Sequence, residues 1–263
     1  MTTEPGPQLA LGVDIGGTGI KGAVVDVASG ELVSDRIKVA TPDGGEPEDV
    51  IRVVAELVER LASPDDGVHD DVDLTGVPLG VCFPAVVVDG RTLTAANVSD
   101  AWIGLEAEKL FEAALGRDIV FVNDADAAGV AEARFGAAKD VPGLVILTTL
   151  GTGIGSALLQ DGVLVRNTEL GHLRIRGRDA EHRAAYSVKE RKKLSWKRWA
   201  GRLQEYYREL ERLFHPRLFV IGGGVSKKAD EFLPLIDART PMVPAAQLNN
   251  AGILGAAWLA ARR

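Results

Sequence analysis

The N-terminal part of the chain alternates between short apolar runs and glycine-rich breaks. Leu9–Ile15, Ile20–Val27 and Glu31–Val39 are rich in β-branched residues, and they are separated by Gly16-Gly17-Thr18-Gly19 and by Ser29-Gly30. Runs of this kind, bounded by glycine turns, are typical of antiparallel strands. The pattern therefore predicts that the chain opens with a β-meander.

Helical and extended patterns then alternate. Apolar residues recur at helical spacing over Glu48–Ala62, which predicts an amphipathic helix. Buried strands are expected over Val77–Phe83 and Ile119–Val122, and helices over Leu105–Leu115 and Ala125–Phe135. The mixed order predicts the α/β class.

The glycine-rich hairpin pattern occurs a second time. Leu144–Leu150 and Ile154–Gln160 flank another glycine turn, and aligning Gly17–Val25 with Gly151–Leu159 matches Gly, Thr, Gly, Ile and Ala at the same hairpin corner. The match indicates an internal duplication. The remaining elements are expected to be a polar helical stretch over Ala180–Phe214, a strand over Leu218–Ile221 and a closing helix over Asn249–Ala261.

Composition places the 263 residues among soluble globular proteins, with 46% apolar and 25% charged residues. No apolar run approaches the ~20 residues that span a bilayer. Met1–Gln8 lacks the features of a signal peptide, so we expect a short disordered tail and a cytoplasmic protein without membrane partners. The single cysteine, Cys82, excludes an intrachain disulfide and is expected to be buried in a strand.

Charge is distributed unevenly along the chain. The formal net charge is -7, which argues against general nucleic-acid binding. Between His172 and Arg202, however, eleven Lys or Arg stand against three acids, a local charge of +8. We call this stretch the basic segment, and it indicates an anionic partner unless it is only a solvated helix face.

The sequence supports neither of two common nucleotide-binding motifs, the dinucleotide fingerprint and the P-loop. Gly17-x-Gly19-x-x-Gly22 fits the dinucleotide fingerprint, but Ala23–Val27 is too short and too β-branched for the helix that must follow. That dehydrogenase interpretation would return only if Ala23–Val27 were helical. The chain also contains no P-loop sequence.

The glycine turns can still bind phosphate. Residues without a Cβ let several backbone N–H groups converge on an oxyanion, and Thr18 and Thr152 add hydroxyl donors. Asp14 ends the first strand, where a carboxylate suits an Mg²⁺ ion that bridges phosphate oxygens. The alternative is that both turns are merely tight hairpins. Asn123-Asp124 could likewise be only a helix N-cap, or could orient and deprotonate an attacking hydroxyl.

Five motifs resemble the ROK family of sugar kinases and sugar-sensing repressors. They are D-I-G-G-T-G-I-K from Asp14, N-D-A-D-A-A from Asn123, T-L-G-T-G-I-G from Thr149, E-L-G-H from Glu169 and I-G-G-G-V from Ile221.

The resemblance implies a two-lobed actin/hexokinase-like, ribonuclease H-like fold with a duplicated core and its active site in the cleft between lobes. The limits expected are 1–118 for a small N-terminal lobe, with 1–8 as its tail, 119–248 for a large C-terminal lobe, and 249–263 for a closing helix on the N-terminal lobe.

The same resemblance implies roles for individual residues. Asp124 is the expected general base, and Asp14 the metal ligand. The expected sugar contacts are Asn97, Asn123, Asp124, Glu169 and His172. The expected donor-binding residues are Gly16, Gly17, Thr18, Gly19, Lys21, Gly151, Thr152, Gly153, Gly222, Gly223 and Gly224.

One departure from the family narrows the resemblance. Most ROK proteins carry a cysteine-rich zinc loop after the Gly-His step, whereas Leu173–Lys193 contains no cysteine. The residues in its place, with Leu194-Ser195-Trp196 and Trp199, are similar to the actinobacterial polyphosphate-using glucokinases. A polyphosphate channel is then expected from Lys189, Arg191, Lys192, Lys193, Lys197 and Arg198.

The sequence therefore predicts phosphoryl transfer from inorganic polyphosphate, and also from ATP, to the 6-hydroxyl of glucose, with Mg²⁺ on the donor. The resemblance further implies a homodimer. An ATP-only hexokinase for another hexose and a non-catalytic sugar sensor stay open as alternatives, although only eight residues precede the first expected strand, too few for the DNA-binding module of such repressors.

Overall fold

The computed structural model describes residues 8–63, 74 and 76–263. The chain divides into two compact units. The first unit comprises Met1–Ala127 and Gly252–Arg263, and the second comprises Ala128–Ala251. The chain passes between them twice, within helix α3 (Asp124–Phe135) and at the start of helix α8 (Ala251–Ala260). Within the described residues, no helix is long and apolar enough to cross a membrane.

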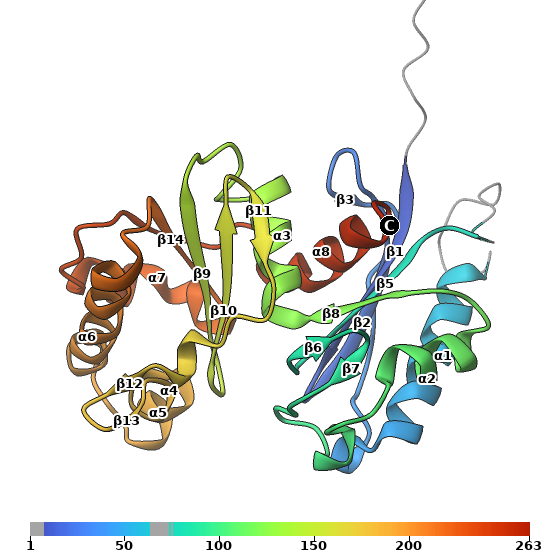
Figure 1. Ribbon diagram of the computed structural model, residues 1–263, viewed down its shortest axis with the longest axis horizontal. Coiled ribbons are helices and arrows are strands. Elements are labelled where there is room, and N and C mark those ends of the chain that lie inside the picture. The colour runs from blue at the N-terminus through green and yellow to red at the C-terminus, as the bar shows by residue number, and fades with distance from the viewer. Residues whose placement is uncertain (1–7, 64–73, 75) are drawn as a thin grey trace, which may run out of the picture. The chain divides into compact units, whose positions relative to one another are not determined.

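The first unit is built on a six-stranded sheet of order β3-β2-β1-β5-β8, with β4 also pairing with β2 (Figure 1). Strands β1 and β2 form an antiparallel hairpin, whereas β1, β5 and β8 run parallel. The strand bounds are β1 Leu9–Gly16, β2 Gly19–Asp26, β3 Glu31–Leu32, β4 Ile37–Val39, β5 Leu79–Phe83 and β8 Val120–Asn123; a small separate hairpin pairs β6 Val87–Val88 with β7 Arg91–Thr92.

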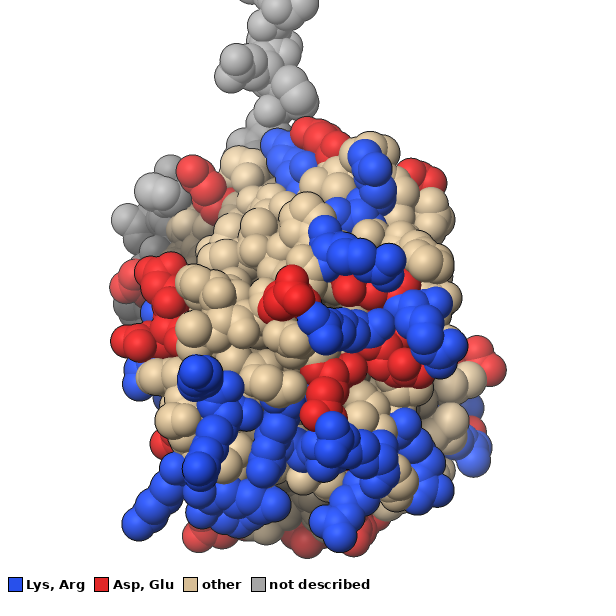
Figure 2. Space-filling view, turned by 90° about the vertical axis from the view of Figure 1, so that its left-hand side faces the viewer, with Lys and Arg blue, Asp and Glu red and all other residues tan. Residues whose placement is uncertain are grey.

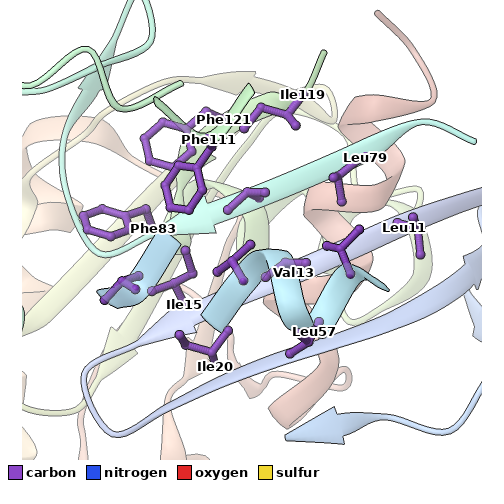
Figure 3. Close-up of a cluster of buried hydrophobic side chains, with 14 of the residues drawn as sticks. Leu11, Val13, Ile15, Ile20, Leu57, Leu79, Phe83, Phe111, Ile119 and Phe121 are labelled. Atoms are coloured by element: carbon purple, nitrogen blue, oxygen red, sulfur yellow. The ribbon is translucent and has the colours of Figure 1, made fainter. Parts of the chain in front are cut away.

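Helices α1 (Pro47–Ala62) and α2 (Ala107–Leu115) cover one face of this sheet. The apolar stripe of α1, which includes Leu57, packs on the β1 residues Leu11, Val13 and Ile15 (Figure 3). Buried rings of Phe83, Trp102, Phe111 and Phe121 extend the same core, with neighbouring ring centroids 4.5 to 5.8 Å apart. This core fixes the strands whose ends carry the predicted site residues.

Helix α8 covers the opposite face of the sheet, and its backbone lies directly against the backbone of the strands. A side chain at Gly12 would overlap the carbonyl oxygen of Ile253, and one at Gly80 would overlap that of Ala256. Glycine is required at both sheet positions because helix and strand backbones meet there. The closing helix therefore belongs to the first unit, although it follows the whole of the second in sequence.

The second unit repeats the architecture of the first. Its five strands lie in the order β11-β10-β9-β14-β15, again with an antiparallel hairpin (β9, β10) followed by parallel neighbours (Figure 1). Helix α6 (Trp196–Phe214) buries Tyr206, Tyr207 and Leu210 against one face. The bounds are β9 Leu144–Leu150, β10 Ile154–Gln160, β11 Val163–Val165, β14 Leu218–Gly222 and β15 Met242–Pro244.

Most predicted elements occur where expected, but the polar helical stretch is wrong as a single helix. It is broken into α4 (Glu181–Ala184), α5 (Tyr186–Arg191) and α6, because Ala185 is extended and Lys193 has a φ of 48°. Strand β15 and the hairpin of β12 (Arg174–Ile175) and β13 (Arg178–Asp179) were not predicted. The remaining short helices are η1 Asp43–Gly45, η3 Asp100–Trp102, η4 Leu170–His172, η5 Gly224–Lys228, α7 Ala229–Phe232, η6 Leu233–Leu235 and η7 Leu248–Asn250.

The expected limit between lobes, after residue 118, lies one strand earlier than the division of the structure. Strand β8 pairs with β5 in the first sheet, so the residues up to Ala127 stay with the first unit. The expected tail, residues 1–8, lies outside the described residues except for Gln8.

Candidate functional site

The first glycine turn, Gly17-Thr18, closes the β1–β2 hairpin, whose last paired residues are Gly16 and Gly19. Two pairs back from the turn, Asp14 lies directly across from Lys21. The Lys21 Nζ atom is 3.0 Å from Asp14 Oδ2, and the two side chains keep 24% and 16% of their surface exposed. The structure therefore holds a cation and an anion side by side next to the first glycine turn.

Asn97 is brought against the same turn. Its φ of 62° lies in the left-handed region, and a side chain at Gly17 would overlap its backbone and Cβ. Two further neighbours were not expected from the sequence. The side chain of Lys38 packs over Gly19, and Thr41 Oγ1 donates a hydrogen bond to the Gly16 carbonyl at 2.5 Å. Lys38 reaches the turn because it pairs with Lys21 across β4 and β2, a register that local sequence patterns do not specify.

Asn123 and Asp124 stand where β8 ends and α3 begins. The buried Asn123 amide accepts a hydrogen bond from the Asp126 N–H at 3.0 Å and donates one to the Ala85 carbonyl at 2.9 Å. It thus caps the helix, as its residue type favours. Asp124 is half-buried, and its Oδ1 accepts from the Ala125 N–H at 2.8 Å. Of the two, Asp124 has the more accessible side chain.

Cys82 is close enough to both Asp14 and Asp124 to be influenced by their charges. Its Sγ atom is 3.5 Å from Asp14 Oδ1, and the side chain is fully buried in β5, as predicted. Burial, and then the negative charges of Asp14 and Asp124, raise the pKa of the thiol well above its usual value. The thiol therefore stays neutral, and Asp14 and Asp124 share one electrostatic environment at the carboxyl ends of parallel strands.

The second glycine turn, Gly151-Thr152-Gly153, closes the β9–β10 hairpin. It is held from the outside by two residues that were not expected from the sequence. Ser187 donates its hydroxyl to the Thr152 carbonyl at 2.6 Å and its N–H to the Gly151 carbonyl at 3.0 Å, and Glu181 Oε2 accepts from the Ile154 N–H at 3.3 Å. Neither contact follows a local sequence rule, because both partners lie more than twenty residues away.

The glycines at the end of β14 and directly after it adjoin this second turn. Gly222 pairs in register with Thr149, and Gly223, with a φ of 83°, lies where a side chain would overlap the backbone of Leu150. Gly224 begins η5 with open space around its Cα. The predicted donor-binding glycines of this unit therefore gather at one end of the sheet.

Glu169 directly precedes the short helix η4, and His172 is its last residue. His172 Nε2 lies 3.7 Å from Glu169 Oε2, and His172 Nδ1 lies 3.1 Å from Asp179 Oδ2. Burial raises the pKa of the Glu169 carboxyl; the nearby His172 acts in the opposite direction and the charge of Glu181 in the same direction. The buried Ser156 hydroxyl accepts from the Leu170 N–H at 2.9 Å and so fixes this segment on β10.

The basic segment divides into two kinds of side chain. One kind is tied into the fold: Arg176 and Arg183 both pair with Glu205, and Lys189 is only 12% exposed, with its Nζ atom 3.0 Å from Glu190 Oε1 and 4.0 Å from the centroid of the Trp196 ring. Lys189 therefore differs from the other expected channel residues. Those five are exposed and make no ion pair within the described residues: Arg191, Lys192, Lys193, Lys197 and Arg198.

Figure 2 shows the corresponding surface, on which Lys and Arg side chains gather over the lower part of the face, where α4, α5 and the β12–β13 hairpin lie in Figure 1. The described residues include no group of three or more His, Cys, Asp or Glu side chains arranged to hold a metal ion. The predicted site residues of the first unit thus lie around the β1–β2 turn and the end of β8, and those of the second lie around the β9–β10 turn, the end of β14, η4 and the basic segment.

The sequence model of the ROK family matches residues 10–185, about two thirds of the chain. The chain belongs to the ROK family. The family predicted from the five motifs is thereby confirmed.

Individual ROK proteins are similar over nearly the full length. The polyphosphate glucokinase of Mycobacterium tuberculosis (strain CDC 1551 / Oshkosh) is 47% identical over 248 residues, covering 94% of this chain and 89% of that protein. The inorganic polyphosphate/ATP-glucomannokinase from Arthrobacter sp. strain KM is 48% identical, with a TM-score of 0.90 over 97% of this chain and 98% of that one. The narrower resemblance predicted from the basic segment is also confirmed.

A second solved ROK structure is less similar in sequence. The ROK family glucokinase from Streptomyces griseus, solved in complex with glucose and AMPPNP, is 26% identical with a TM-score of 0.76, covering 97% of this chain and all of that one. These neighbours confirm the two-lobed actin/hexokinase-like fold with its duplicated core.

Proposed function

We propose that this ROK protein transfers the terminal phosphoryl group of inorganic polyphosphate, and also of ATP, to the 6-hydroxyl of glucose. The observation that carries the proposal is the 47% identity over 94% of the chain to a protein named polyphosphate glucokinase. A structure neighbour named polyphosphate/ATP-glucomannokinase supports both donors. The products are glucose 6-phosphate and either ADP or a polyphosphate shortened by one phosphate.

Asp124 is the proposed general base. It is half-buried at the carboxyl end of β8, and Asn123 holds that strand end by capping α3 and bonding to Ala85. A carboxylate in this position accepts the proton of the 6-hydroxyl while the hydroxyl oxygen attacks the terminal phosphorus and the bond to the leaving phosphate breaks. Proton transfer of this kind contributes about 10² to 10⁴ in rate.

The donor phosphates are the proposed ligands of the two glycine turns. The proposed donors are backbone N–H groups of the Gly16–Gly19 and Gly151–Gly153 stretches, except that of Gly151, which donates to the Gly153 carbonyl at 3.1 Å. Lys21 lies beside the first turn and Gly222–Gly224 beside the second. The exposed side chain of Lys38 adds a second cation to the first turn. Thr18 and Thr152, both exposed at their turns, add hydroxyl donors.

Asp14 suits an Mg²⁺ ion. Magnesium keeps several waters and takes one or two protein carboxylates together with substrate phosphates, and the first unit offers Asp14 with Asp124 nearby rather than a closed set of ligands. Bound there, the ion would neutralise charge on the donor phosphates. Lys21, which pairs with Asp14, would hold the carboxylate in place.

The sugar is the proposed ligand of Asn97, Asn123, Asp124, Glu169 and His172. Glu169 and His172 place a carboxylate oxygen and a ring nitrogen 3.7 Å apart, a spacing that suits neighbouring hydroxyl groups of one sugar. Asn97 lies on the first glycine turn, beside the proposed donor site. Glu181, which influences Glu169 and contacts the second glycine turn, joins the sugar and donor regions of its unit.

Polyphosphate is the proposed ligand of the five exposed cations of the basic segment, Lys189 being left out because it pairs with Glu190 and Trp196. Polyphosphate carries about one charge per phosphate, so a row of unpaired Lys and Arg binds it through charge-assisted hydrogen bonds and the release of counterions. ATP, with three phosphates, reaches fewer of these side chains. Salt should therefore weaken the use of long polyphosphate more than the use of ATP.

One assay tests the whole proposal. Glucose 6-phosphate formation is measured with ATP and with polyphosphates of several lengths, each over a range of salt concentrations. We expect activity with both donors and a rise of KM with salt that is steeper for long polyphosphate. Activity with ATP alone would identify an ATP-only hexokinase, and equal salt dependence for the two donors would contradict the channel.

A matched pair of variants locates the channel. The double variant Lys193→Ala/Lys197→Ala should raise the KM for long polyphosphate and lower its salt slope by about one per lysine, with little effect on ATP. Lys109→Ala/Lys139→Ala removes two other exposed lysines as the control and should leave both donors unchanged. The same loss in both double variants would show that only overall charge matters.

The expected cytoplasmic location and homodimeric state stay predictions. Cell fractionation tests the first, and light scattering after size-exclusion chromatography tests the second.

A further inference from the structure

The His172 ring has a different partner at each nitrogen. Nδ1 is within hydrogen-bond distance of Asp179 Oδ2, at 3.1 Å, whereas Nε2 is 3.7 Å from Glu169 Oε2. An ionised carboxylate can only accept a hydrogen bond, so the Asp179 contact requires the proton on Nδ1. In the neutral ring, Nε2 then carries a lone pair.

We propose that Asp179 is a positioning residue for sugar binding: by accepting from His172 Nδ1–H it fixes the tautomer in which Nε2 accepts a hydrogen bond from a sugar hydroxyl. The inference rests on the sugar-binding role proposed above for His172 and Glu169. In this tautomer Nε2 and the Glu169 carboxylate are two acceptors 3.7 Å apart, matched to two hydroxyl groups that both donate.

The segment that carries Asp179 is fixed by backbone pairing in a short hairpin. Arg174 pairs with Asp179 and Ile175 with Arg178 in the β12–β13 hairpin, and the turn between them has two residues with positive φ, Arg176 at 52° and Gly177 at 76°. Turns of this conformation match the twist of a two-stranded hairpin. The Ala180 N–H donates to the Leu173 carbonyl at 2.9 Å and closes the base of the hairpin.

Glu205 of α6 anchors the same hairpin. Its two carboxylate oxygens accept from Arg176 at 2.8 Å and from Arg183 at 3.1 Å, so one acid joins the tip of the hairpin and the following helix α4 to α6. Because α6 is packed into the core through Leu203, Tyr206 and Tyr207, the position of Asp179 is set by the fold of the second unit. Part of the basic segment thus serves to hold this hairpin.

The substitutions Asp179→Asn and Asp179→Ala separate a tautomer effect from a structural one. The asparagine amide can donate to Nδ1, which places the proton on Nε2 and turns an acceptor into a donor facing the sugar. We expect the KM for glucose to rise about 10- to 100-fold in the asparagine variant, with a smaller rise in the alanine variant, where water can take the place of the carboxylate. The kcat at saturating glucose and the KM for polyphosphate should change little in either.

A spectroscopic measurement reads the tautomer directly. In ¹⁵N-histidine-labelled protein without sugar, the two-bond ¹⁵N–¹H pattern of His172 should show a protonated Nδ1 in the unsubstituted protein and a protonated Nε2 in the asparagine variant. The signal is assigned by its absence in His172→Gln. Asp230→Asn, an exposed aspartate on α7, is the matched control and should change neither the spectrum nor the KM.

The outcomes are distinct. A protonated Nε2 in the unsubstituted protein would overturn the inference whatever the enzyme phosphorylates, since the spectrum needs no substrate. An unchanged KM for glucose in Asp179→Asn would also overturn it, as would a larger loss in the alanine variant than in the asparagine variant, which is the order a purely structural role gives. A failure of the proposed function itself would instead appear as absent glucose 6-phosphate formation in the unsubstituted protein.

Discussion

The two sheets have the same strand order, yet within the described part of the chain only the first hairpin pairs an acidic residue with a basic one across its strands beside the glycine turn. When the apolar pairs nearest the turns are matched, Ile15 with Ile20 corresponds to Leu150 with Ile154. The next pairs are then Asp14 with Lys21 in the first unit and Thr149 with Gly155 in the second. Thr149 therefore stands in the register position of Asp14. The first hairpin has one more residue between the matched pairs, since four residues separate Ile15 from Ile20 and three separate Leu150 from Ile154.

The glycine turns are shared by the two units, whereas the charged side chains of the proposed site differ between them. Both units have a glycine turn at the end of an antiparallel hairpin, which is the part of the design that backbone N–H groups provide. The carboxylates Asp14 and Asp124 belong to the first unit, and the proposed sugar-binding pair Glu169 and His172 belongs to the second. We infer that phosphate binding is the shared property of the two halves, that the base belongs to the first, and that each half contributes its own set of sugar contacts.

The largest effect is expected at Asp124, which directly follows β8. Strand β15 (Met242–Pro244) has the corresponding place in the second sheet, and it contains no charged residue. Asp124→Asn keeps the hydrogen bond to the Ala125 N–H but removes the proton acceptor, so kcat should fall about 10² to 10⁴-fold. Glucose affinity, measured by calorimetry, should fall much less. Asp118→Asn, an exposed aspartate before β8, is the control; ordinary turnover in Asp124→Asn would contradict its role as base.

The next effect is expected from the two register-equivalent positions. Asp14→Asn removes the proposed magnesium ligand and should lower kcat/KM about 10²-fold while raising the magnesium concentration needed for half-maximal rate. Thr149→Val at the equivalent position of the second hairpin should have a much smaller effect. Similar losses at both positions would show that the asymmetry between the hairpins has no catalytic meaning.

A third test compares helix contacts in the two units. Gly80→Ala forces a methyl group into the backbone of α8 and should lower the free energy of unfolding by about 1–3 kcal/mol or more. Gly201→Ala on α6 meets open space and should raise it by about 0.5–1 kcal/mol, because glycine is a poor helix residue. Urea unfolding of both variants measures the difference, and a neutral Gly80→Ala would exclude the close contact.

The smallest effect concerns Glu169, whose pKa is raised above the ordinary 4.5 chiefly by burial. A raised carboxyl pKa means that the folded state disfavours the charged form, so this residue's contribution to stability is present at low pH and is lost as pH rises through the folded pKa. Glu169→Gln should therefore make the protein slightly more stable at neutral pH while weakening glucose binding. Glucose affinity of the unsubstituted protein should fall as pH drops through the same pKa. Thermal unfolding at pH 7 and calorimetry across acidic pH check both signs, and a Gln variant that is less stable at pH 7 would contradict them.

Local patterns in the sequence were enough to predict the two glycine-turn hairpins, the helices α1 and α3, and the internal duplication. These features depend on alternation, helical spacing and glycine turns, all of which are short-range. The cap formed by Asn123 was also predictable, because asparagine before an alanine-rich helix favours that position.

The missed features depend on long-range register and on side-chain pairing. Nothing near Ser187 or Glu181 shows that they hold the second glycine turn, and the pairing of Asp179 with His172 requires the β12–β13 hairpin, whose strands have only two residues each. The sequence does not distinguish Lys189 from its exposed neighbours, because a count of charges does not show that its ammonium group lies over the Trp196 ring. Tertiary contacts decided these positions.

Helix α8 also determines the order in which the units can be completed as the chain leaves the ribosome. The second unit is one continuous stretch, Ala128–Ala251, whereas the first lacks the helix packed against Gly12 and Gly80 until residues 252–263 have emerged. During synthesis, the unit encoded later should therefore reach its final packing before the one encoded first. The earlier sheet has to wait with one apolar face uncovered, which makes it the part of the nascent chain most exposed to chaperones and to aggregation.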